Sequence, residues 1–99
     1  MKKLFISQPM QGKSDEEILI ERKALIARAQ EKIGEEVEAL DTFFTDFDGN
    51  ALAFLGKSIS ALSEADVAIF GAGWKDARGC RIEHICCVEY GTDRIDDLA

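Results

Sequence analysis

Short apolar runs alternate with amphipathic segments along the chain, and this pattern predicts alternating strands and helices. The runs KKLFIS, EVEAL and DVAIFGAG, at residues 2–7, 36–40 and 66–73, predict β-strands, and DRID at residues 93–96 predicts a short last strand. DVAIFGAG is uninterrupted by polar residues after its first position, which is typical of a strand buried on both faces of a parallel sheet.

A long helix is predicted between the first two strands, over residues 14–34. Ser14 and Glu17 have the spacing of a capping box, and Gly34 has the character of a helix stop. Apolar residues recur within the segment at helical spacing, at Ile18, Leu25, Ala29 and Ile33. These signals define the first helix at both of its ends.

Two further helices are predicted, over residues 51–65 and from about residue 79 to residue 90. Asn50 is placed to cap the second helix, and Gly56 lies inside it. One apolar face of the second helix is expected to consist of Leu52, Leu55, Ile59 and Leu62.

The alternation of strands and helices predicts an α/β fold, Rossmann-like or flavodoxin-like, with three layers and a small parallel sheet of about four strands. The whole chain, residues 1–99, is expected to form one domain. Such sheets bind ligands at the carboxyl ends of their strands, near the point where the winding reverses. Residues 7–12, 41–50 and 71–79 are therefore expected to meet there, whereas Asp66 opens its strand at the opposite end.

Composition and charge narrow the class of partner. The chain is 46% hydrophobic and 31% charged, with a formal net charge of −7, which disfavours binding to a nucleic-acid polymer. No leader and no run long enough to span a bilayer is recognised, so a cytoplasmic protein without membrane partners is expected.

The three cysteines, Cys80, Cys86 and Cys87, are odd in number and lack CxxC spacing, which favours reduced thiols. Cys80, His84 and Cys87 share one stripe of the predicted third helix, but no fourth ligand is recognisable in the sequence. We therefore predict neither a metal nor another cofactor.

Glu83 is the most unusual residue of the third helix. At about 100° per residue it projects between Cys87 and Tyr90, on the apolar side, whereas Arg81 and His84 project to the opposite, solvated side. A carboxylate in a first turn is stabilised by the helix dipole, and this structural role is one interpretation. The other is that Glu83 faces the ligand crevice and serves as a functional group.

Three segments carry a resemblance to a known family: LFISQPMQGKS, LSEADVAIF and GCRIEHICCVEYG. Together they resemble the nucleoside 2-deoxyribosyltransferases, the related 2′-deoxynucleoside 5′-monophosphate N-glycosidases and small phage-encoded relatives of unassigned activity. The likeness covers nearly the whole chain, and its most specific part is Gly-x-x-x-Glu, which runs from Gly79 to Glu83.

The resemblance implies an enzyme that cleaves or transfers at the N-glycosidic bond of a deoxynucleoside or its monophosphate. Glu83 would be the nucleophile, Gly79 would allow close backbone approach, and Gly12 would form a turn beside the sugar or phosphate. The family's partner aspartate corresponds to Ser58. Either Asp46, Asp48 or Asp76 replaces it, or the glycosidase chemistry is weak or lost. The alternative is then a phage-type protein that binds or sequesters a nucleotide-derived small molecule.

Further side chains are expected to surround the substrate. Gln8 offers an amide at the end of the first strand; Trp74 either stacks on a base or covers the sheet edge; Lys13 and Arg78 either hold a phosphate or are surface charges. The complete predicted substrate-binding set is Ser7, Gln8, Met10, Gly12, Lys13, Ser58, Trp74, Asp76, Arg78 and Gly79.

Four phenylalanines, Phe43, Phe44, Phe47 and Phe54, lie within twelve positions. They predict either a lid over the ligand or a subunit contact, because so much aromatic surface is unusual on a small monomer. Gly56 favours the contact, since a glycine permits close approach of two helices. We therefore expect a homodimer or a higher homo-oligomer.

Overall fold

The computed structural model describes residues 1–44 and 47–98. Its elements are β1 (Lys2–Ser7), α1 (Asp15–Ile33), β2 (Val37–Ala39), α2 (Ala51–Leu62), β3 (Val67–Phe70), the short 3-10 helix η1 (Trp74–Asp76), α3 (Arg78–Tyr90) and β4 (Asp93–Ile95). The strands form one sheet in the order β2-β1-β3-β4, and all neighbouring pairs are parallel. The predicted α/β fold with a four-stranded parallel sheet is confirmed.

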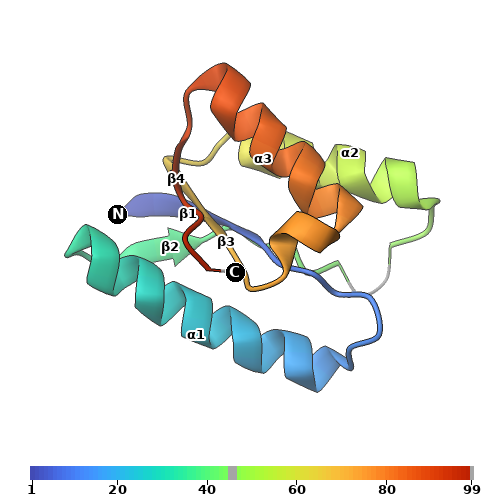
Figure 1. Cartoon of the computed structure of the whole chain (residues 1–99), viewed down its shortest axis with the longest axis horizontal. Coiled ribbons are helices and arrows are strands. Elements are labelled where there is room, and N and C mark those ends of the chain that lie inside the picture. Colours follow the sequence, from blue (N-terminus) through green and yellow to red (C-terminus); the bar gives the residue numbers. More distant parts are fainter. Residues whose placement is uncertain (45–46, 99) are drawn as a thin grey trace.

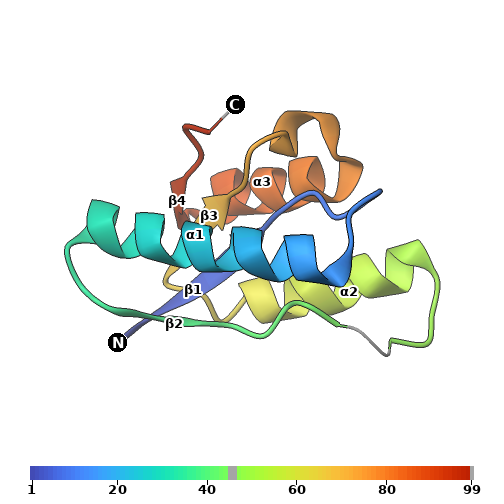
Figure 2. The same ribbon diagram turned by 90° about the horizontal axis from the view of Figure 1, so that it is seen from below.

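The sheet lies between two helical layers, with α1 on one face and α2 and α3 on the other (Figures 1 and 2). A hydrophobic core lies on each face of the sheet, and β1 contributes side chains to both because successive residues of a strand point to opposite faces. Leu4 and Ile6 pack towards α1, and Phe5 packs towards α2 and α3. β3 is buried along its whole length, as its uninterrupted apolar sequence predicts.

The ends of α1 follow from local sequence. The Ser14 side chain accepts a hydrogen bond from the Glu17 backbone N–H at 3.2 Å, and the Glu17 side chain bonds back to Ser14. Gly34 ends the helix in the left-handed conformation, with a φ of 82°. The capping box and the glycine stop are both confirmed.

α2 differs from its prediction in two ways. It ends at Leu62 rather than at residue 65, and Leu52 is 76% exposed instead of lying on the buried face. The buried positions of the helix are Ser58 and Leu62, because the helix is rotated so that Ser58 faces the interior. Gly56 has nothing within 4 Å of the position that a Cβ would take, so it makes no close helix contact within the described chain.

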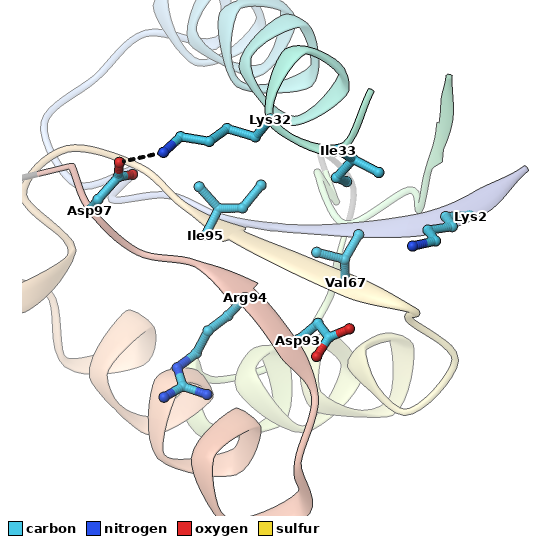
Figure 3. A pocket seen from close by; sticks show the side chains of 8 residues that line it. All are labelled: Lys2, Lys32, Ile33, Val67, Asp93, Arg94, Ile95 and Asp97. Carbon is cyan, nitrogen blue, oxygen red and sulfur yellow. Dashed lines mark ion pairs between the residues drawn. The ribbon is translucent and has the colours of Figure 1, made fainter. Parts of the chain in front are cut away.

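The amino-terminal edge of the sheet is tied together by polar contacts. The Lys3 backbone N–H donates to Asp66 Oδ2 at 2.8 Å, so Asp66, at the end of the sheet away from the cavity, has a structural role. A cavity of about 360 Å³ lies at this edge, between β4 and the end of α1, and Lys32 pairs there with Asp97 at 3.0 Å (Figure 3). Neither α1 nor any other described helix combines the length and apolar character that a membrane span requires.

Candidate functional site

A cavity of about 1100 Å³ opens at the carboxyl ends of β1 and β3. β1 has β2 on one side and β3 on the other, so this is the point where the winding of the sheet reverses. The walls come from the segment after β1, from Thr42, from the first turns of α2 and from the start of α3. Figure 1 shows these segments gathered at one end of the molecule. The predicted meeting of three loops is confirmed.

Glu83 lies in the wall of this cavity and is only 7% exposed. Its Oε1 accepts a hydrogen bond of 2.6 Å from the Ser7 hydroxyl, which is itself 2% exposed at the end of β1. The two residues are 76 positions apart in the sequence, and they meet because β1 ends beside the second turn of α3. The expectation that Glu83 faces the crevice is confirmed.

Burial changes the acidity of Glu83. Loss of solvent raises the pKa of its carboxyl from 4.5 to about 7, and the hydrogen bond from Ser7 acts in the opposite direction and lowers the pKa. A pKa raised this far makes both the ionised and the protonated form of Glu83 accessible near neutral pH. A carboxyl group in this state can act as a nucleophile or base when ionised and as an acid when protonated.

The neighbouring thiols are less reactive groups. Cys80 lines the same cavity, and burial raises the pKa of its thiol. Burial also raises the pKa of Cys87 to about 11. Because the thiolate is the nucleophilic form of cysteine, Glu83 is a better candidate than either thiol for covalent chemistry at neutral pH.

Most of the predicted substrate-binding set is brought together. The predicted residues that line the cavity together with Glu83 are Ser7, Gln8, Met10, Ser58, Asp76, Arg78 and Gly79. Ser58 is 5% exposed and occupies the α2 wall. Gly79 has room for a side chain, since a Cβ there would first meet Leu55 Cδ1 at 3.9 Å.

Three residues of the set lie outside the cavity wall: Gly12, Lys13 and Trp74. Gly12 does form a turn, with a φ of 80°. Lys13 Nζ pairs with the Glu21 carboxylate at 2.8 Å, which directs its charge towards α1. Trp74 is 7% exposed and packs against Phe70, so of its two predicted roles it takes the one of covering the sheet.

The prediction that His84 is solvated is wrong. Its ring stacks on Trp74 with 4.2 Å between centroids and an interplanar angle of 22°. Its Nε2 lies 2.7 Å from Asp96 Oδ2, and this hydrogen bond lowers the pKa of Asp96. The helical projection was wrong for this residue because η1 and the segment after β4 cover a side of α3 that the projection left open to solvent.

Among the carboxylates considered as replacements for the family's aspartate, Asp76 lines the cavity. Asp48 and Asp76 are both exposed, but Asp48 does not line the cavity, and Asp46 lies outside the described residues. Asp76 is therefore the candidate that the described structure brings to the site.

The phenylalanine-rich segment packs partly on itself. Phe44 and Phe47 both meet Phe54 edge to face, at 5.3 and 5.6 Å between ring centroids, and Lys57 Nζ lies 4.3 Å from the centre of the Phe44 ring. All four rings are half-buried within the chain, so part of their aromatic surface remains exposed.

Two wall features were missed from the sequence. Thr42 lines the cavity after β2, and Arg22 is buried behind it. A signal for Arg22 was present, since it lies four residues after Ile18 and three before Leu25, within the apolar stripe of α1.

Within the described residues, no three metal-binding side chains gather as they would around a metal ion, and Cys80 and His84 point to different surroundings. Comparison with known proteins gives no family assignment: no family model matches the chain, and no curated protein or solved structure matches it significantly.

Proposed function

We propose that the protein cleaves or transfers at the N-glycosidic bond of a deoxynucleoside or its 5′-monophosphate, with Glu83 as the nucleophile. The observation that carries the proposal is a buried carboxyl group in a large cavity, held by the Ser7 hydroxyl at 2.6 Å. The resemblance of residues 79–91 to the deoxyribosyltransferase motif supplies the reaction class.

The reaction has two steps. A Glu83 oxygen attacks the anomeric carbon, a carbon–oxygen bond forms, and the carbon–nitrogen bond breaks with its electron pair leaving on the base. Water or a second base then attacks the same carbon, and the bond from that carbon to the Glu83 oxygen breaks with its electron pair on the carboxylate. The proton lost by the attacking group passes to the carboxylate that protonated the first base. Because Ser7 occupies Oε1, Oε2 is the oxygen assigned to the attack.

The leaving base requires a proton, and Asp76 is the carboxyl group of the cavity wall assigned to this role. Ser58, at the position of the family's aspartate, carries a hydroxyl that is a very weak acid. It is assigned to hydrogen bonding with the substrate instead.

Ser58 also favours a second candidate function, which is binding without catalysis. In that case the same cavity takes up a nucleotide-derived small molecule, and Glu83 accepts a hydrogen bond from it. The two functions share the site and differ only in whether the glycosidic bond breaks.

One assay separates them. The protein is incubated with a panel of deoxynucleosides and their 5′-monophosphates, and free base is measured by chromatography. Glycosidase or transferase activity releases base, and Glu83→Gln reduces that release by several orders of magnitude while the exposed Glu89→Gln on the same helix retains it. Ligand-dependent thermal stabilisation without base release establishes the binding function. Retained activity in Glu83→Gln refutes the nucleophile assignment.

We further infer a cytoplasmic homo-oligomer. The three cysteines form no disulfide in the structure, which fits a reducing compartment. Leu52 is 76% exposed at the cavity mouth, beside the half-buried phenylalanines, and this apolar surface supports a subunit contact there. Light scattering gives the mass; a monomer at micromolar concentration contradicts the inference.

A further inference from the structure

A buried arginine lies behind the cavity wall. Arg22 is 8% exposed and shares the inner stripe of α1 with Ile18, Leu25 and Ala29. Burial lowers the pKa of its guanidinium, and the exposed Asp41 carboxylate acts in the opposite direction. Within residues 1–44 and 47–98, no carboxylate forms an ion pair with Arg22 at 4 Å or less.

The Arg22 guanidinium contacts neutral acceptors at the ends of β1 and β2. One terminal nitrogen donates to Gln8 Oε1 at 3.4 Å and to Thr42 Oγ1 at 3.2 Å, and the other donates to the Leu40 carbonyl oxygen at 3.2 Å. Gln8 and Thr42 both line the cavity, so Arg22 joins two wall residues from behind.

These contacts determine which way the Gln8 amide points. Arg22 has only donors, so the Gln8 atom that faces it must be the carbonyl oxygen. The Ile18 carbonyl is only an acceptor, and Gln8 Nε2 donates to it at 3.3 Å. The reverse orientation would place the amide nitrogen against a cation and the amide oxygen against a carbonyl.

One hydrogen of the Gln8 amide remains for a ligand. Nε2 carries two hydrogens, and Ile18 is the one acceptor that Nε2 has among the described residues. Gln8 is 6% exposed and lines the cavity, and its Oε1 is turned towards Arg22, so the Nε2 hydrogen that Ile18 leaves unpaired is the group we assign to a ligand acceptor.

We propose that Arg22 is a positioning residue that fixes Gln8 as a one-way hydrogen-bond donor, and that Gln8 thereby selects substrates that present an acceptor at that point. Such an acceptor is a carbonyl oxygen or an unprotonated ring nitrogen of the base. This inference rests on the proposed function for the identity of the substrate, but the orientation of Gln8 is a property of the free protein.

The first test needs no substrate. The rate at which the Gln8 side-chain amide protons exchange with water is measured by NMR, and the exposed Gln11 is the matched control. Gln8→Met identifies the Gln8 signals by their loss. Exchange in the wild type is expected to be about tenfold or more slower for Gln8 than for Gln11, because burial and hydrogen bonding protect it.

Arg22 variants connect this protection to the guanidinium. Arg22→Met is expected to accelerate exchange at Gln8, and Arg22→Lys, which still offers only donors to Oε1, is expected to restore part of the protection. Equal exchange at Gln8 and Gln11 in the wild type overturns the proposal, even if Arg22→Met does not fold. Protection at Gln8 that survives in a folded Arg22→Met also overturns it.

The second test concerns selectivity. Each deoxynucleoside that the protein accepts is compared with analogues that lack one base acceptor: deaza bases, in which C–H replaces a ring nitrogen, and deoxo bases, in which C–H replaces a carbonyl group. The comparison uses kcat/KM where base is released and ligand-dependent melting temperature in every case. With the wild type, kcat/KM or binding affinity is expected to be about tenfold or more lower for one analogue than for its parent nucleoside. Gln8→Met is expected to remove this difference. Selectivity that persists in Gln8→Met overturns the proposal. Selectivity without base release refutes the proposed reaction and supports the role of Gln8, and the lack of any response to every nucleoside overturns both.

Discussion

Replacing Glu83 by glutamine is expected to stabilise the protein at alkaline pH and to have little effect on stability at acid pH. The folded protein holds the pKa of this carboxyl at about 7, compared with 4.5 in the unfolded chain. The folded state therefore binds the proton more tightly, so the stability of the wild type falls as the pH rises from about 4.5 to about 7. The loss is essentially complete about one pH unit above the folded-state pKa.

The size of this effect follows from the same two pKa values. At 1.36 kcal/mol for each pKa unit, moving the pKa from 4.5 to about 7 corresponds to about 3 kcal/mol of stability lost by the wild type. Glutamine carries no charge at any pH and can still accept the Ser7 hydrogen bond through its Oε1. The variant therefore avoids the cost of burying a carboxylate.

Urea denaturation at pH 4 and pH 8 measures the expected difference. The gain in unfolding free energy on going from wild type to Glu83→Gln should be about 3 kcal/mol larger at pH 8 than at pH 4. Glu89→Gln, an exposed position on the same helix, removes the same charge and serves as the control. An equal gain at both pH values, or an equal pH dependence in Glu89→Gln, refutes the account of Glu83 as a carboxyl group whose ionised form is destabilised by burial.

Three further predictions concern single residues. Ser7→Ala removes a hydrogen bond that lowers the pKa of Glu83, so the rise of base release with pH should move to higher pH, as a pH–rate profile measures. Gly12→Ala should destabilise the protein by about 1 kcal/mol in urea denaturation, because its φ of 80° is unfavourable for alanine. Gly56→Ala should stabilise the protein by about 1 kcal/mol in the same assay, since the site is open and helical; a loss of oligomer mass in this variant would instead reveal a close contact at Gly56.

Much of the fold follows from signals that are local in the sequence. The capping box at Ser14, the stop at Gly34 and the apolar run of β3 each depend on a few neighbouring residues, and each is confirmed. The end of α2 and the exposure of Leu52 depend instead on how the helix is rotated against α3, which its own sequence does not specify. Four apolar residues at helical spacing therefore predicted a buried face that is displaced by part of a turn.

The candidate site was predictable to the extent that topology and helical spacing determine it. The strand ends brought Ser7 and Gln8 to the cavity, and the projection of α3 placed Glu83 beside them. Trp74, His84 and Arg22 contact side chains that belong to other elements or to the segments between them, so the helical pattern of their own segment could not specify these contacts. Arg22 is the clearest case, since its role depends on acceptors from the ends of two strands.

Because Trp74 stacks on His84, its intrinsic fluorescence can report on the state of the protein. Trp74 is the only tryptophan in the sequence. The centroid of its ring lies 4.2 Å from that of the His84 imidazole and 5.4 Å from that of the Phe70 ring. It stands at the start of η1, in the segment that leads to the cavity wall, so a ligand that shifts this segment changes the emission of a single fluorophore. Unfolding separates the two rings and exposes the indole to water. Ligand titrations and denaturation curves can therefore be recorded by fluorescence without an attached label.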